Sequence, residues 1–101
     1  MPDDRAQELE AHLTRLLQLI DSKPPANDPE SLGQAEVDVS DLATNAPQGS
    51  DMKRLAAELI TDLGDWYGGR HAAAASGAIR ATQEKLKERI QALYSAALDR
   101  R

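Results

Sequence analysis

The longest uninterrupted helical pattern in the chain runs over residues 70–101, which read RHAAAASGAIRATQEKLKERIQALYSAALDRR. Small or apolar residues recur along it at alternating steps of three and four, the spacing of one face of a helix. They are Ala72, Ser76, Ile79, Leu86, Ile90, Leu93 and Ala97, and Gln83 is the one bulky polar interruption. The opposite face is charged. The pattern predicts an amphipathic helix whose apolar stripe needs a partner helix.

Two further helices are predicted upstream. Residues 3–22 carry a heptad pattern after a capping Asp3 or Asp4, with Ala6, Leu9, Leu13, Leu16 and Ile20 on one face. Residues 51–67 follow a cap at Ser50 or Asp51 and carry a wide stripe of Met52, Leu55, Ala56, Leu59, Ile60, Leu63, Trp66 and Tyr67. Gly68-Gly69 is the strongest stop signal. We therefore expect a tight turn there and an antiparallel hairpin of the last two helices.

Residues 24–50 lack a strong period and are interrupted by prolines and glycines. They contain no basic residue, since the bases on either side are Lys23 and Lys53. The stretch predicts an acidic linker that connects the first helix to the other two. The alternative is a peptide-like segment that becomes ordered when it docks on a partner.

Composition limits both the size of the core and the choice of partners. The formal net charge is −5, and residues 1–50 hold ten acids against three bases (3 − 10 = −7), whereas residues 51–101 hold seven acids against nine bases (9 − 7 = +2). Binding to nucleic acid is not expected, because that affinity comes largely from Lys and Arg contacts to phosphate. Leu, Ile, Val and Phe number only 19 among 101 residues, and 17 residues are alanines. A monomer with so little large apolar surface is expected to be marginal, and self-association is the simplest remedy.

The predicted fold class is therefore all-α: a three-helix chain organised as segment 1–23, linker 24–50 and hairpin 51–101. We expect a homodimer in which the long C-terminal helices pair, as an oligomeric helical bundle or an antiparallel coiled coil. The predicted interface residues are Leu9, Leu13, Leu16, Ile20, Ile79, Leu86, Ile90 and Leu93.

The chain has few residues of the types that bind metal ions or carry out catalysis. The chain has no cysteine, and His12 and His71 are its two histidines. Glu8 lies four residues before His12, so one helical face presents a carboxylate and an imidazole, but two ligands do not make a metal site. No phosphate-binding glycine loop or Ser-His-acid motif is visible. The sequence thus predicts no metal, no cofactor and no enzymatic activity.

The most distinctive hexad is Trp66-Tyr67-Gly68-Gly69-Arg70-His71. Trp, Tyr and Arg are enriched at binding hot spots, which makes Trp66, Tyr67, Arg70 and His71 the predicted partner-binding residues. The alternative is that Trp66 closes the end of the bundle, with Tyr67 and His71 half-exposed beside it.

The function predicted from these features is a non-enzymatic protein–protein interaction module, such as an adaptor, assembly factor, docking subunit or small chaperone. An acidic inhibitor that occupies the nucleic-acid-binding surface of a partner is one alternative. A second arises from Trp66-Tyr67-Gly68, which resembles the WxG motif of small secreted helical-hairpin proteins that lack a cleavable signal; the resemblance implies a one-to-one complex with a similar helical partner. We expect no signal peptide and no membrane span, and a cytoplasmic location.

Overall fold

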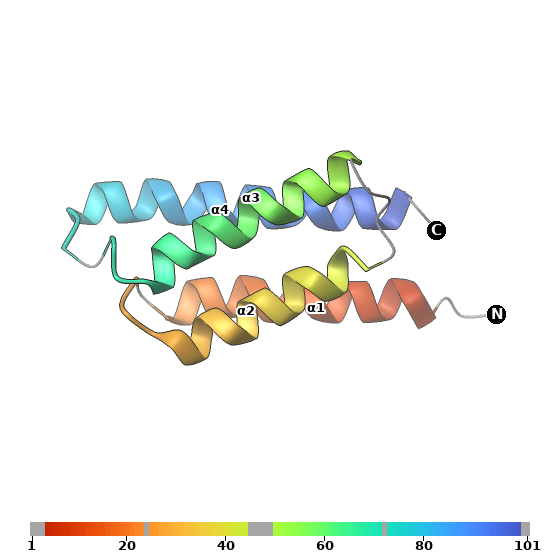
Figure 1. Cartoon of the computed structure of the whole chain (residues 1–101), viewed down its shortest axis with the longest axis horizontal. Coiled ribbons are helices and arrows are strands. Elements are labelled where there is room, and N and C mark those ends of the chain that lie inside the picture. The colour runs from red at the N-terminus through yellow and green to blue at the C-terminus, as the bar shows by residue number, and fades with distance from the viewer. Residues whose placement is uncertain (1–3, 24, 45–49, 72, 100–101) are drawn as a thin grey trace.

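The computed structural model describes residues 4–23, 25–44, 50–71 and 73–99. Within these ranges the chain forms four helices: α1 (Asp4–Ser22), α2 (Pro29–Leu42), α3 (Asp51–Tyr67) and α4 (Ser76–Asp99). Successive helices alternate in direction, and both termini lie at the same end of the bundle (Figure 1). α1 and α3 each pack against α2 and α4. The predicted all-α class is confirmed, and the architecture is a compact helical bundle.

The predicted number of helices is wrong, because the stretch expected to be a linker contains α2. Asp28 caps this helix: its carboxylate accepts hydrogen bonds from the Ser31 backbone N–H at 3.1 Å and from the Ser31 hydroxyl at 2.7 Å. Pro29 occupies the first turn, where its missing N–H costs nothing and its fixed φ suits the helix. Ala35, Val39 and Leu42 then place one buried face against the rest of the bundle.

The loop between α1 and α2 is fastened to the end of α3. The backbone N–H groups of Ala26 and Asp28 donate to the carbonyl oxygens of Trp66 (3.2 Å) and Tyr67 (2.9 Å). The last carbonyls of a helix have no partner within the helix, so the loop supplies one. Gly69, two residues after the end of α3, has a φ of 89°, a conformation that glycine adopts most readily.

The last helix is shorter than expected. The sequence predicts a start near residue 70, whereas α4 begins at Ser76. Residues 68–71 and 73–75 connect α3 to α4, and Ala72 lies outside the described residues. Alanine favours the helix, but it offers little apolar area to pack, and short helical turns without packing are costly to nucleate. The predicted tight glycine turn is therefore only the beginning of a longer connection.

The core lies along the axis of the bundle and draws on all four helices. Its largest fully buried side chains include Trp66, Tyr67, Leu16, Ile20, Leu42 and Leu59. Six of the eight residues predicted to form an interface are also buried inside this one chain: Leu9, Leu16, Ile20, Leu86, Ile90 and Leu93. Leu13 and Ile79 are partly buried against the same core. The predicted seam thus joins helices of a single chain. Pairing with a second copy stays a prediction, and the six buried side chains could take part in it only if the bundle opened.

Gln83, the polar interruption of the last helix, has a structural role. Its amide nitrogen donates to the carbonyl oxygen of Ile20, near the C-terminal end of α1, at 3.1 Å. One turn later, Lys87 pairs with Asp21 at 2.9 Å. These contacts join α4 to the acidic N-terminal half of the chain and help to set the register of α1 against α4.

Candidate functional site

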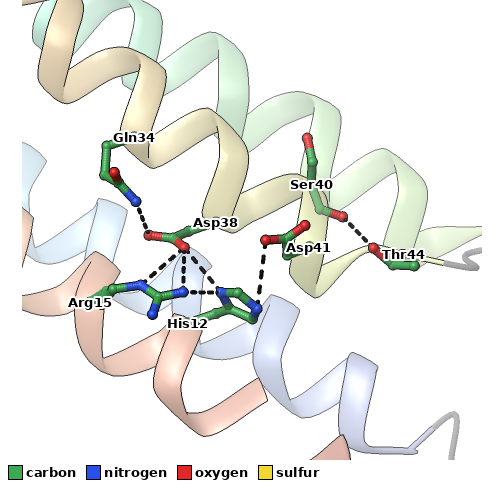
Figure 2. A network of polar contacts seen from close by, with 7 residues as sticks. All are labelled: His12, Arg15, Gln34, Asp38, Ser40, Asp41 and Thr44. Atoms are coloured by element: carbon green, nitrogen blue, oxygen red, sulfur yellow. Dashed lines mark hydrogen bonds and ion pairs between the residues drawn. The ribbon is translucent and has the colours of Figure 1, made fainter. Parts of the chain in front are cut away.

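The polar cluster between α1 and α2 is the most unusual feature of the bundle (Figure 2). α1 contributes His12 and Arg15, which lie three residues apart and so project from the same face of the helix. α2 contributes Gln34, Asp38 and Asp41 from the facing side.

Asp38 is the centre of this cluster, and only 1% of its surface is exposed. Its Oδ1 atom accepts from Arg15 Nη2 at 3.0 Å and Arg15 Nε at 3.3 Å, and it lies 3.0 Å from His12 Nδ1. Its Oδ2 atom accepts from Gln34 Nε2 at 3.4 Å. A buried carboxylate is costly unless it is paired and hydrogen-bonded, and here both oxygens have partners.

His12 stands between two carboxylates of α2. Its Nδ1 faces Asp38, whereas its Nε2 lies 3.7 Å from Asp41 Oδ2. Arg15 Nη2 lies 2.6 Å from Nδ1 as well as 3.0 Å from Asp38 Oδ1, so its proton can go to either acceptor according to the tautomer of the ring. Asp38 therefore orients the imidazole, and the Nε2 edge points away from the core.

That Nε2 edge borders a hollow of about 300 Å³ between α1 and α2. Glu8, Leu9, His12, Asp41 and Thr44 line it. Glu8 and Asp41 are exposed, while Leu9 is part of the core. The arrangement combines an oriented imidazole with carboxylate oxygens at an accessible position, a donor set suited to holding a cation.

The predicted partner-binding turn is largely internal. Trp66 and Tyr67 are 1% and 0% exposed. Tyr67 donates its hydroxyl to the carbonyl of Leu19 at 3.2 Å, and burial raises its pKa to about 12. Trp66 is buried at the end of the bundle, as the alternative predicts. Tyr67 is fully buried, whereas the alternative expects it to be half-exposed.

The accessible part of the turn is Arg70 and, in part, His71. Arg70 is exposed and pairs with Asp65 at 3.3 Å. The His71 ring lies 6.0 Å from the Trp66 ring and borders a small hollow of about 100 Å³ between α3 and α4. Asp62, which also borders that hollow, forms an ion pair with Arg89 of α4. Binding of a partner at this turn stays a prediction, and Trp66 and Tyr67 could contribute to it only if the bundle opened.

The sequence alone drew attention to Glu8 and His12 but not to their partners on α2. Asp38 and Asp41 lie in the segment expected to be a linker, for which the sequence pattern predicts no helical face. The signal that would have found them is Asp28-Pro29-Glu30-Ser31, a capping residue followed by proline at the first helical position. With a helix starting there, residues 34, 38 and 41 fall on one face.

Comparisons of this chain with protein-family models, with curated proteins and with solved structures found no match. Across the described residues, every helix is too short or too polar to cross a membrane.

Proposed function

We propose that this protein is a non-enzymatic helical interaction module that binds an amphipathic helix of a protein partner in the groove between α2 and α3. The observation that carries the proposal is Val37. Among the described residues it is the exposed large hydrophobic side chain, with 57% of its surface accessible. It lies on α2 three residues before Ser40, a residue that lines the groove.

The groove suits the close approach of a helix. It has a volume of about 300 Å³ and is lined by Ser40 and Ala43 of α2 and by Lys53, Ala56, Ala57 and Ile60 of α3. The small side chains of the lining would let the backbone of a partner helix come close, and Ile60 adds apolar surface. A helix laid in such a groove is recognised through apolar residues spaced three or four apart.

Charge favours a basic partner. α2 contains Glu30, Glu36, Asp38 and Asp41 and has no basic residue. Asp38 is buried and Asp41 faces His12 of α1, so Glu30 and Glu36 are the acids of α2 that are left to meet a partner. The expected partner helix therefore carries an apolar stripe flanked by Lys or Arg on the side that meets α2, an arrangement that aids specificity and association rate.

A matched pair of substitutions tests the groove. Ala57→Arg places a long charged side chain in it, and Ala92→Arg makes the same change at an exposed alanine of α4. A photoreactive residue at Val37 should cross-link to a helical segment of the partner, and mass spectrometry identifies that segment. The proposal predicts that Ala57→Arg removes the cross-link and Ala92→Arg keeps it. Equal cross-linking in both variants would refute the groove as the binding surface.

The identity of the cross-linked species, the salt dependence of binding and a second cross-linker at Arg70 separate the other candidate functions. A second copy of this chain as the cross-linked species would indicate the homodimer. A partner whose affinity falls steeply with salt and ignores Ala57→Arg would support the acidic inhibitor of a nucleic-acid-binding surface, because exposed charges are screened by salt. A small helical partner bound at Arg70 and His71 would instead support a complex of the WxG kind.

A further inference from the structure

We propose that the cluster between α1 and α2 is a binding site for a divalent transition-metal ion, with Zn²⁺ as the representative ion. The proposed ligands are His12 Nε2 and the carboxylates of Asp41 and Glu8, and Asp38 is the positioning residue for His12. The proposal does not depend on the groove between α2 and α3, which is formed by different residues.

The first step of the argument is convergence from two helices. One ligand atom from each of His12, Asp38 and Asp41 lies within 4.8 Å of the others. Glu8 precedes His12 by one turn on α1 and lines the same hollow as His12 and Asp41. The hollow is therefore bordered by one imidazole nitrogen and two accessible carboxylates. Glu8 lies outside the group within 4.8 Å, so its exposed side chain has to turn toward His12 and Asp41 to complete the ligand set.

The second step is the separation between the two nearest candidate ligands. His12 Nε2 and Asp41 Oδ2 are 3.7 Å apart, which is too long for a direct hydrogen bond. Two ligands of a tetrahedral ion with bonds of about 2.0–2.1 Å lie roughly 3.3–3.4 Å apart. A shift of a few tenths of an ångström would thus seat an ion between these atoms.

The third step is the orientation of the imidazole. A histidine that binds a metal usually donates its other ring N–H to a carboxylate or carbonyl, which fixes the tautomer and raises the basicity of the ligand. His12 Nδ1 lies 3.0 Å from Oδ1 of the buried Asp38, in the place that such a carboxylate takes. Ion binding at Nε2 places the proton on Nδ1. Arg15 Nη2 lies 2.6 Å from Nδ1 and can only donate, so its half-exposed side chain must move away from the protonated ring nitrogen and donate to Asp38 alone.

The fourth step is the choice of ion. Imidazole suits Zn²⁺ and its first-row neighbours, whereas sites for Mg²⁺ and Ca²⁺ are built from oxygen ligands. Three protein ligands would leave one position of a tetrahedral Zn²⁺ for water on the open side of the hollow. The arrangement favours a transition-metal ion over Mg²⁺ or Ca²⁺.

The test is calorimetric titration of the untagged full chain with ZnCl₂ at neutral pH, followed by visible absorption with Co²⁺. We expect one ion per chain. His12→Gln and Asp41→Asn should each weaken binding by at least about tenfold, and Asp38→Asn by about 10–100-fold through the loss of positioning. Asp41 is exposed, so its variant is expected to keep the fold, which circular dichroism verifies for all variants.

The control variants are His71→Gln, which removes the other histidine, and Glu10→Gln, which removes an exposed acid of α1 outside this hollow. Both should bind Zn²⁺ as the unmodified chain does. The proposal is overturned if Zn²⁺ does not bind, if His12→Gln and Asp41→Asn bind it normally, or if His71→Gln weakens it as much as His12→Gln. Displacement of Zn²⁺ by an equal concentration of Mg²⁺ would also overturn it.

Discussion

Tyr67, at the end of α3, donates its hydroxyl to the backbone carbonyl oxygen of Leu19, near the end of α1, over 3.2 Å and 48 residues of chain. α1 and α3 each pack against α2 and α4 and lie diagonally across the bundle. The bond therefore connects these two helices at the end of the bundle where both of them end. The α1–α2 loop meets the same end, because Ala26 and Asp28 donate to the last carbonyls of α3. This end of the bundle is therefore held by defined polar contacts as well as by apolar packing.

The burial of Tyr67 predicts a loss of stability in alkali. Its pKa is raised from 10.0 to about 12 in the folded chain, chiefly by burial. The folded state therefore retains this proton more strongly, so the stabilisation is complete below pH 10 and is lost as the pH rises toward 12. Each pKa unit corresponds to about 1.4 kcal/mol, so a rise of about two units makes the loss at most about 3 kcal/mol. Urea unfolding at several alkaline pH values measures it.

Tyr67→Phe is the control for this effect. At pH 7 it should cost only about 0.5–1.5 kcal/mol, since the carbonyl of Leu19 keeps the hydrogen bond from the Lys23 N–H. The stability difference between the two proteins should then shrink between pH 10 and 12. A constant difference over that range would contradict the burial of the phenol.

Gln83→Ala should destabilise the bundle by about 1 kcal/mol, because it removes the hydrogen bond to the carbonyl of Ile20. Gln91→Ala is the matched control, since Gln91 is exposed on the same helix. Thermal unfolding of the two variants checks the prediction. Equal melting temperatures would mean that Gln83 does not join α4 to α1.

Arg15→Ala should cost on the order of 1–3 kcal/mol, because it removes two N–H donors from the buried carboxylate of Asp38. In an Asp38→Ala background the same substitution should cost much less. A double-mutant cycle measured by chemical unfolding isolates this coupling. Additive effects would show that the Arg15 contact contributes nothing to the pairing of α1 with α2.

Asp28→Ala should lower the melting temperature by removing the cap of α2, whereas Asp28→Asn should largely preserve it, since both Asp and Asn accept the capping bond. The hydrogen bonds from Ser31 lower the pKa of Asp28 below 3.8. Its charge therefore stabilises the fold above pH 3.8, and that contribution is lost as the pH falls through the lowered pKa. The advantage of Asp over Ala should accordingly diminish in strong acid, and a difference independent of pH would contradict the ionic part of the cap.

The sequence predicted the elements whose signals are local. Ser50 caps α3 with a hydrogen bond from the Lys53 N–H, and α3 covers residues 51–67 as expected. α1 begins within a residue of its predicted start. These segments combine a capping residue with a strong apolar period, so their local signals agree with the packing.

The missed features depend on context. Prolines such as Pro29 indicate an interrupted segment over residues 24–50, yet proline is also well suited to the first turn of a helix, where Pro29 lies. The homodimer is predicted from composition, because 19 large aliphatic residues among 101 indicate a marginal monomer, and composition does not show that four helices share one core. The candidate metal site was missed because Asp38 and Asp41 lie on α2. The unrecognised α2 thus accounts for the wrong number of helices and for the acids that the sequence does not place on a helical face, while pairing with a second copy stays a prediction.

The most direct test of this account is therefore an NMR measurement of backbone chemical shifts and amide hydrogen exchange over residues 29–42 in the full chain. We predict helical shifts throughout this segment, with slow exchange for the amides of buried Val39 and Leu42 comparable to that in α3. Random-coil shifts with fast exchange over 29–42 would contradict the four-helix bundle. They would also remove the structural basis for both the groove and the metal site.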